Sequence, residues 1–329
     1  MSPSSQSVLV YDVGGSHISA ALCDRRTYAL RGLSRAPLPA EGAGHFSAAS
    51  FGRLIHALGE SAAKAAATPL SGILGASLAM PGPFDYENGI SQMRHKLTSL
   101  FGIDLKAALA QRFGWQPAQF RFVNDAGAFL LGEVGAGAGK GYARAIGITL
   151  GTGIGCAFAV DGRIAIPSNQ PDGDPTVPPG GEIWNLPYNG ATVEDFVSTR
   201  FLRGHYQALT GLEAEVAAIA DAAKGDHPCP DPPPAPLPKL DPADPYAAHC
   251  RARQAFQDFG RHLALALNHQ HAAAFDPDVI VLGGGISRAH HLFLPATRKA
   301  LVGIHAKLAI SALMDEAPLA GAGVHWFTA

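Results

Sequence analysis

Two segments of the chain share a design that restricts the possible folds: an apolar run, a glycine turn and a second apolar run. The first covers residues 7–24 (SVLVYDVGGSHISAALCD), and the second covers residues 143–160, where Gly-Thr-Gly separates the runs. Apolar runs of this length predict buried strands, and the glycines allow the chain to reverse between them. Helical patterns follow the strands. The sequence therefore predicts an α/β protein of two similar halves with a cleft between them.

The apolar periodicity predicts the remaining elements. Strands are expected at 7–13, 17–24, 28–33, 73–79, 120–123, 143–150, 154–160 and 279–282. Helices are expected at 47–66, 104–113, 126–134, 192 to about 209 and 246–275, with irregular structure over 165–191 and mostly helices after 285. Residues 225–245 predict a surface loop, because their many prolines lack backbone donors.

Length and patterning suggest where the two domains lie. The chain has 329 residues, which is comfortable for two domains. We expect a smaller N-terminal domain over 1–123 and a larger C-terminal domain over 124–307, which includes the proline-rich loop. A C-terminal helix over 308–329 could join the first domain.

Composition excludes several classes of function. A net charge of −2 gives no electrostatic reason to expect a nucleic-acid partner. The N-terminus lacks the pattern of a signal peptide, and no apolar stretch is long enough to span a membrane. The four cysteines form no CxxC pair, so the spacing indicates neither a zinc knuckle nor a disulfide framework. A cytoplasmic protein is the default expectation.

The first glycine turn has the features of a phosphate-binding loop. Asp12 ends a predicted buried strand, and Gly14, Gly15 and Ser16 follow it. Glycine lets backbone N–H groups approach a phosphate closely, and a serine hydroxyl adds a donor. Asp12 could hold Mg²⁺ directly or through water. The alternative is a hairpin whose turn needs glycine for steric reasons only.

Two later glycine turns offer comparable chemistry. Gly151, Thr152 and Gly153 lie between two predicted strands, and could present several N–H donors and one hydroxyl to phosphate oxygens. A strand follows instead of a helix, so the dinucleotide-binding fingerprint does not fit. Gly284 and Gly285 follow a buried strand, where a flat ring such as adenine could lie against the backbone. The alternatives are a tight hairpin and a strand-to-helix turn.

Asn124 and Asp125 lie where a predicted strand ends and a helix begins. Regular structure on both sides would fix their side chains toward a cleft. Asp125 could accept a proton from a hydroxyl group, while Asn124 bonds a neighbouring hydroxyl. The alternative is that Asp125 only caps the helix.

Taken in order, these motifs resemble the ROK sugar kinases, which belong with hexokinase, actin and the Hsp70 ATPase domain. The resemblance runs from about residue 8 to about residue 320. It is most specific in DVGGSHISAAL (12–22), MPGPFD (80–85), VNDAGAFLLGE (123–133), ITLGTGIG (148–155) with DG (161–162), and VIVLGGGIS (279–287). It implies two actin-like, ribonuclease H-like ATPase domains.

The resemblance also implies roles for individual residues. Asp125 would be the base that deprotonates the sugar hydroxyl, and Asn124 would bind sugar hydroxyls. Glu182, in PGGEIWN, matches the glutamate of the family's GExGH motif, and Glu194 matches the glutamate that contacts the sugar near its anomeric end. Asp12 would assist Mg²⁺. The three glycine turns would hold the phosphates and adenosine of ATP, through Gly14, Gly15, Ser16, Gly151, Thr152, Gly153, Gly284 and Gly285.

The sequence departs from the family pattern at three places. Asn185 replaces the histidine of the GExGH motif, and residues 183–193 contain no cysteine, whereas most members carry a zinc-binding cysteine cluster there. Lys96 lies near the position that usually supplies an asparagine to the sugar. The sequence therefore predicts a variant without structural zinc, and these departures leave glucose specificity open.

The expected protein is a glucokinase-like enzyme that uses ATP and Mg²⁺ to phosphorylate a hexose hydroxyl, and the resemblance suggests a homodimer. Three alternatives stay open: a non-catalytic sugar sensor of the same fold, an ATPase or chaperone-like module, and a polyphosphate-dependent sugar kinase. The first predicted strand begins near Ser7, so the sequence predicts no N-terminal helix-turn-helix. It does not identify the sugar or the phosphorylated position.

Overall fold

The computed structural model of the chain describes residues 6–38, 47–94, 97–225, 229, 245–269 and 272–328. Its contacts divide the chain into two compact units. The first unit contains Met1–Ala143, Ala159–Ile164 and Ser311–Ala329, and the second contains Arg144–Phe158 and Ala165–Ile310. Strands and helices are mixed in each unit, which confirms the predicted α/β class.

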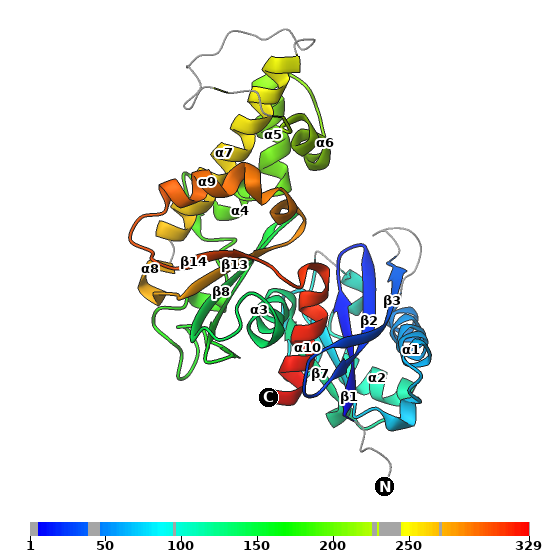
Figure 1. Cartoon of the computed structure of the whole chain (residues 1–329). Helices are drawn as coiled ribbons and strands as arrows, with labels where there is room; N and C mark the ends of the chain where they lie inside the picture. The colour runs from blue at the N-terminus through cyan, green and yellow to red at the C-terminus, as the bar shows by residue number, and fades with distance from the viewer. Residues whose placement is uncertain are drawn as a thin grey trace. The chain divides into compact units, whose positions relative to one another are not determined.

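The first unit is built on a five-stranded sheet of order β3-β2-β1-β4-β7 (Figure 1). Its strands are β1 (Ser7–Val13), β2 (His17–Asp24), β3 (Leu30–Pro37), β4 (Ala76–Met80) and β7 (Phe120–Asn124). The first three strands form an antiparallel meander, whereas β1, β4 and β7 are parallel. A small hairpin, β5 (Phe84–Asp85) with β6 (Ile90–Ser91), follows β4.

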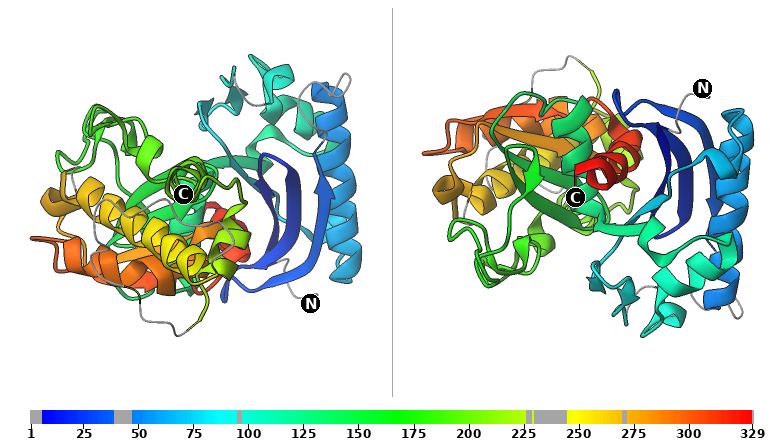
Figure 2. Two further views of the ribbon diagram at one scale, coloured as in Figure 1. Left: turned by 90° about the horizontal axis from the view of Figure 1, so that it is seen from above. Right: turned by 90° about the horizontal axis from the view of Figure 1, so that it is seen from below.

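Helices cover both faces of this sheet. On one face lie α1 (Ala48–Ala65) and α2 (Leu105–Phe113), and on the other lies α10 (Ala317–Thr328), as Figures 1 and 2 show. Ser47 caps the start of α1, and its side chain accepts a hydrogen bond from Ser50 N–H. Its apolar residues recur at helical spacing and are buried against the sheet: Phe51, Ile55, Leu58 and Ala62.

Helix α3 (Asp125–Ala136) packs against α10 with backbone in contact with backbone. A Cβ atom added at Gly132 would lie 2.1 Å from the carbonyl oxygen of Ala317, and one at Gly321 would lie 1.7 Å from that of Ala128. Only glycine allows this separation. Because of this packing the contacts group α3 with the first unit, so the division differs from the boundary expected between residues 123 and 124.

The second unit contains most of a five-stranded sheet of order β10-β9-β8-β13-β14. Its strands are β8 (Arg144–Leu150), β9 (Ile154–Val160), β10 (Arg163–Ile164), β13 (Val279–Gly283) and β14 (Lys307–Ile310), with β10 and the end of β9 grouped in the first unit. Strand β13 is parallel to both neighbours, β8 and β14. The helices are α4 (Val193–Phe196), α5 (Thr199–Thr210), α6 (Val216–Ala222), α7 (Pro245–His269), α8 (Ala272–Phe275) and α9 (His290–Ala300). Helices α7 and α9 lie side by side (Figure 2).

Several sequence predictions need correction in the second unit. The helix expected from 192 to 209 is two helices, because Ser198 leaves helical geometry and caps α5 by accepting from Phe201 N–H at 3.4 Å. The irregular region contains a hairpin, β11 (Pro187–Tyr188) with β12 (Ala191–Thr192). Strand β14 lies in the region where mostly helices were expected, and the expected helix over 246–275 is divided into α7 and α8.

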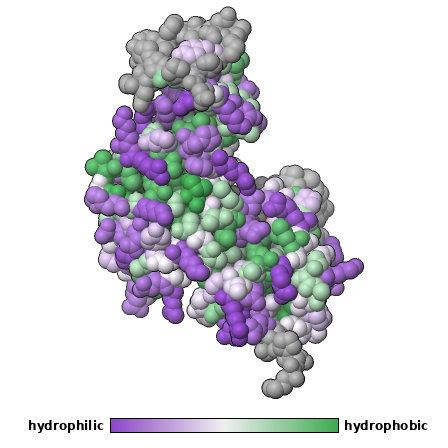
Figure 3. Space-filling model, in the orientation of Figure 1, coloured by the Kyte–Doolittle hydropathy of each residue, from purple (hydrophilic) through white to green (hydrophobic). Residues whose placement is uncertain are grey.

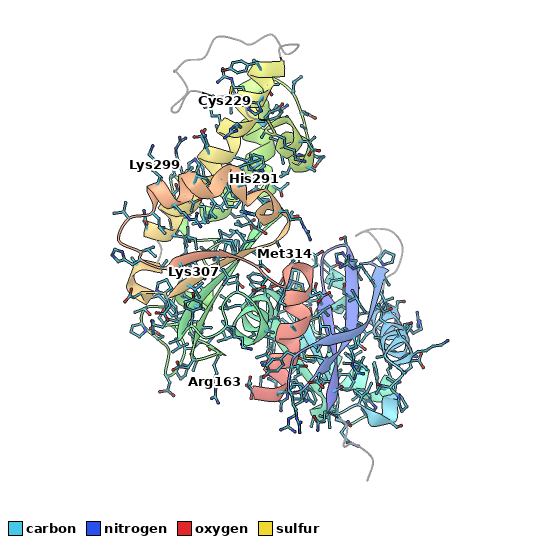
Figure 4. The ribbon with its side chains drawn as sticks, viewed as in Figure 1. Arg163, Cys229, His291, Lys299, Lys307 and Met314 are labelled. Atoms are coloured by element: carbon cyan, nitrogen blue, oxygen red, sulfur yellow. A yellow bond between two sulfur atoms is a disulfide. The ribbon has the colours of Figure 1, made fainter. Side chains whose placement is uncertain are left out.

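The cysteine pattern is also corrected. Cys229 and Cys250 form a disulfide, with Cα atoms 5.5 Å apart. Figure 4 labels Cys229 beside one end of α7. Most of the expected loop over 225–245 lies outside the described residues.

Figure 3 shows hydrophilic residues distributed over the visible surface of each unit. Within the described ranges, no helix is both long enough and apolar enough to cross a membrane.

Candidate active site

The two aspartates singled out in the sequence both belong to the first unit. Asp12 lies one residue before the end of β1, opposite Ala79 of β4, and Asp125 follows directly after β7, whose last residue pairs with Met80 of β4. Carboxyl ends of neighbouring parallel strands meet at one edge of a sheet, which is where α/β proteins place ligands. The fold therefore brings the two carboxylates to the same edge.

The charge at this edge affects Asp12 strongly. The pKa of Asp12 is raised to about 7, first by burial and then by the negative charge of Asp125. Arg35, on β3, opposes this shift, and Asp315 adds to it. Ionised Asp12 is thus poorly stabilised by the protein alone, so a cation beside it would be favoured.

Asn124, not Asp125, is the cap of α3. Its Oδ1 accepts a hydrogen bond from Gly127 N–H at 3.0 Å, and Asp125 is the first helical residue. Asn124 is therefore the N-cap residue, and the Asp125 carboxylate also accepts a hydrogen bond in the first turn, from Ala126 N–H at 2.9 Å. The amide nitrogen of Asn124 donates to the hydroxyl of Tyr86 at 3.1 Å, and that hydroxyl donates to the carbonyl of Met80.

Tyr86 was missed by the sequence analysis. It lies after the MPGPFD motif that carries the resemblance, and its position was the only available signal. By bridging β4 and Asn124 it fixes the start of α3, which carries Asp125. Asn124 thus has two protein partners that orient it.

The glycine turn of the first unit leaves space beside its backbone. Gly14 N–H donates to the carbonyl of His17 at 3.0 Å, which closes the hairpin between β1 and β2. No atom lies within 4 Å of a Cβ built at Gly15, and Ser16 is exposed with its hydroxyl 3.2 Å from His17 Nδ1. The turn therefore closes a β-hairpin, as the steric alternative for its glycines required. It also leaves open space beside the backbone of Gly15.

The glycine turn of the second unit is held at its first residue. The carbonyl of Gly151 accepts hydrogen bonds from the backbone N–H and the hydroxyl of Thr199, at 2.8 and 2.9 Å. No atom lies within 4 Å of a Cβ built at Gly151, and Thr152 is exposed. The turn therefore presents an open outer side on a fixed backbone.

The late glycine turn, at Gly284 and Gly285, packs against Leu150, the residue just before the Gly151 turn. Gly284 has φ of 81°, and a Cβ atom there would lie 2.4 Å from the carbonyl oxygen of Leu150. Glycine is required on both grounds. Gly285 has no atom within 4 Å of an added Cβ. Two of the predicted nucleotide-binding turns are thus adjacent in the second unit.

One predicted sugar ligand, Glu194, contacts the Gly151–Gly153 turn. The Glu194 carboxylate accepts from Ile154 N–H at 3.3 Å, and a Cβ atom added at Gly153 would lie 2.1 Å from its Oε2. Glu182 is close enough to Cys156 for its charge to raise the pKa of that thiol, after burial as the main cause. Both glutamates therefore lie near β9 in the second unit.

The predicted residues thus form two groups, one in each unit: Asp12, Gly14, Gly15, Ser16, Asn124 and Asp125 in the first, and Gly151, Thr152, Gly153, Glu182, Glu194, Gly284 and Gly285 in the second. Asn185 lies in an exposed turn, and Lys96 lies outside the described residues. Among the described residues, no group of three or more His, Cys, Asp or Glu side chains is placed to hold a metal ion.

Solved structures of other proteins share this fold. The chain superposes on a ROK hexokinase from Thermus thermophilus with a TM-score of 0.69 and 23% identity, over 97% of each chain. It superposes on a ROK family glucokinase from Streptomyces griseus, in complex with glucose and AMPPNP, with a TM-score of 0.66 and 22% identity, over 96% of this chain and 98% of the other. These likenesses confirm the predicted fold.

Sequence comparison names the family. The family described as ROK matches residues 8–324. The chain is 30% identical to the glucokinase of Thermotoga maritima over 234 residues, which are 68% of this chain and 67% of that protein. The chain therefore belongs to the ROK family.

Proposed function

We propose that this protein transfers the γ-phosphoryl group of ATP to a hydroxyl of a hexose, with Asp125 as the general base. The single observation that carries the proposal is the placement of Asp125. It begins a buried helix beside a second carboxylate, Asp12, while Asn124 performs the capping role. The complex of the Streptomyces glucokinase with glucose and AMPPNP supports both substrates.

The chain's own residues would act as follows. The Asp125 carboxylate takes the proton of the acceptor hydroxyl as the oxygen attacks phosphorus, and Asn124 orients a neighbouring hydroxyl. Glu182 and Glu194 bind further hydroxyls of the sugar. The backbone N–H groups of Ser16, Gly15, Thr152 and Gly153 bind phosphate oxygens, while those of Gly14 and Gly151 close their own turns, and Gly284 and Gly285 lie against the adenosine.

Asp12 suits the Mg²⁺ that accompanies ATP. Its pKa is raised to about 7 by burial, so a cation is needed to favour its ionised form at neutral pH. Mg²⁺ commonly uses one or two carboxylates together with substrate phosphates and water, so one aspartate is a sufficient protein ligand. When bound, the ion neutralises charge on the phosphates.

The test is coupled ADP release with Mg-ATP against a panel of hexoses and N-acetylhexosamines. We expect sugar-dependent turnover in the wild type, and about a 10²- to 10⁴-fold loss of kcat in Asp125→Asn with ATP affinity retained. Asp221→Asn is the matched control, because that side chain is exposed in the second unit. Turnover of Asp125→Asn within tenfold of the wild type would refute the base assignment.

The same assay separates the alternatives. Sugar binding without ADP release would indicate a sensor, ADP release that ignores sugar would indicate an ATPase, and turnover with polyphosphate but not ATP would reassign the donor. We also propose a homodimer, as the family resemblance implies. Light scattering on the purified protein would show whether its mass is twice 34.1 kDa.

A further inference from the structure

A buried tyrosine fastens the hairpin next to Glu194 to the long helix of the second unit. Tyr188, on β11, is only 8% exposed, and its hydroxyl lies 2.9 Å from Nδ1 of His262 on α7. The rings of Phe196 and Phe201 lie 4.9 and 5.0 Å from the imidazole ring, centroid to centroid. The polar contact is thus part-buried and flanked by aromatic side chains, which reduce its access to water.

The charge states fit a bond in which tyrosine donates. Burial lowers the pKa of His262, more than the opposing charge of Asp258 raises it, and the charges of His205 and Arg261 lower it too. Burial also raises the pKa of Tyr188. A neutral imidazole can accept at Nδ1 from a phenol that keeps its proton.

The hairpin and α4 form one connected piece. The side chain of Asp195 accepts from the backbone N–H and the hydroxyl of Thr192, at 3.0 and 2.7 Å, which joins β12 to the first turn of α4. Glu194 N–H donates to the carbonyl of Trp184 at 3.0 Å, which ties α4 back to the segment before the hairpin. The backbone position of Glu194 therefore depends on where the hairpin is fastened.

We propose that Tyr188 and His262 are positioning residues that set the Glu194 carboxylate for the sugar. The inference rests on the proposed function, because it takes Glu194 as a sugar ligand. Residues 183–193 contain no cysteine, so the fastening here is a hydrogen bond and an aromatic enclosure made by the chain itself.

The phosphate side of the same unit should be less affected. The turn at Gly151 is held by Thr199, through two hydrogen bonds that do not involve the hairpin. Loosening the Tyr188 contact should therefore weaken sugar binding while ATP binding persists. A residue that mattered only for stability would not produce this separation.

The first experiment compares Tyr188→Phe with Tyr206→Phe. Tyr206 is a matched control, because it is a buried tyrosine of α5 in the same unit. We expect the KM for sugar, and the sugar Kd by calorimetry, to rise by about 3- to 10-fold in Tyr188→Phe, as the loss of one buried hydrogen bond implies. The KM for ATP should stay within about twofold, and Tyr206→Phe should resemble the wild type in both constants.

Variants at the partner provide a rescue test. His262→Asn keeps a polar group near the position of Nδ1, whereas His262→Leu removes it. We expect the sugar KM of His262→Asn to be closer to the wild type than that of His262→Leu. Equal sugar affinities in the two variants would argue against a hydrogen-bonded anchor.

A double-mutant cycle tests whether the anchor acts through Glu194. In a Glu194→Gln background, adding Tyr188→Phe should change sugar affinity by less than about twofold, because the group being positioned is already altered. Additive effects, or Tyr188→Phe with lower stability but an unchanged sugar KM, would overturn the inference. A wild type that releases no ADP with any sugar would instead overturn the proposed function.

Discussion

Glu133 is the buried carboxylate on which the first unit should depend most. It is fully buried on α3 and accepts four hydrogen bonds. One oxygen accepts from the Ser311 hydroxyl at 2.6 Å and from Leu313 N–H at 3.0 Å, and the other accepts from the N–H groups of Ala138 and Ala312 at 2.7 and 3.2 Å. Every partner donates, so the site requires an acceptor on both oxygens.

Glu133→Gln keeps the shape and replaces one accepting oxygen by an NH₂ group. In either orientation this group faces at least one N–H donor, with a second N–H or the Ser311 hydroxyl beside it. Two hydrogen bonds to a charged acceptor are lost, at roughly 1.5–3 kcal/mol each. Relief from burying a charge offsets part of this sum. We therefore expect the free energy of unfolding of the first unit to fall by about 3 kcal/mol.

Urea denaturation followed by tryptophan fluorescence measures this loss. Trp115 and Trp326 belong to the first unit and Trp184 to the second, so a Trp184→Phe background makes the signal specific to the first unit. Glu60→Gln is the matched control in the same unit: its side chain is 58% exposed beside His56, so we expect a change below about 0.5 kcal/mol. A Glu133→Gln variant as stable as this control would refute the reasoning.

Two further predictions concern the candidate site. Asp12→Asn should stabilise the ligand-free protein at pH 8, by on the order of 2–4 kcal/mol, and have little effect near pH 4. The pKa of Asp12 is raised from its ordinary value of 3.8 to about 7. Its favourable contribution to the free energy of unfolding is therefore present below pH 3.8 and is lost as the pH rises through 7. Equal changes in thermal unfolding at both pH values would contradict this. Gly153→Ala should raise the sugar KM by roughly 10-fold or more, because its Cβ would lie 2.1 Å from Glu194 Oε2 and must displace that carboxylate. Gly204→Ala, in open space on α5, should leave the sugar KM unchanged, and a Gly153→Ala enzyme with normal sugar KM would show that Glu194 is not the ligand.

The sequence predicted local features of the site well, because local chemistry determines them. The first two glycine turns lie between buried strands and the third follows the buried strand β13, as expected, since apolar runs and glycines specify both. Asp125 was correctly placed at the start of a helix, but Asn124 was not recognised as the residue that caps it. Adjacent Asn and Asp are both good capping residues, and only the backbone angles of Asn124 distinguish them.

Features that depend on distant partners could not be predicted. Tyr188 and His262 are 74 residues apart in sequence, and neither stands in a recognisable motif. The Cys229–Cys250 disulfide has the same origin, because spacing alone does not determine cysteine pairing. Helix α3 is apolar around most of its surface because α10 covers one side, and that helix comes from the other end of the chain.

The break between α4 and α5 could have been predicted. Ser198 is followed three residues later by Phe201, whose N–H it accepts, and serine at the start of an amphipathic run is a helix-start signal. The apolar periodicity across 192–209 concealed it, because α4 is only one turn long.

The packing of α10 against α3 has a consequence for biosynthesis. The first unit needs residues 311–329 to complete its core, whereas the second is complete at residue 310. Domains generally fold as units while the chain leaves the ribosome. We therefore expect the second unit to finish folding earlier, although most of the first is synthesised before it. In Figure 4, Met314 marks the turn into α10, where the chain returns to cover one face of the sheet that its first strands form.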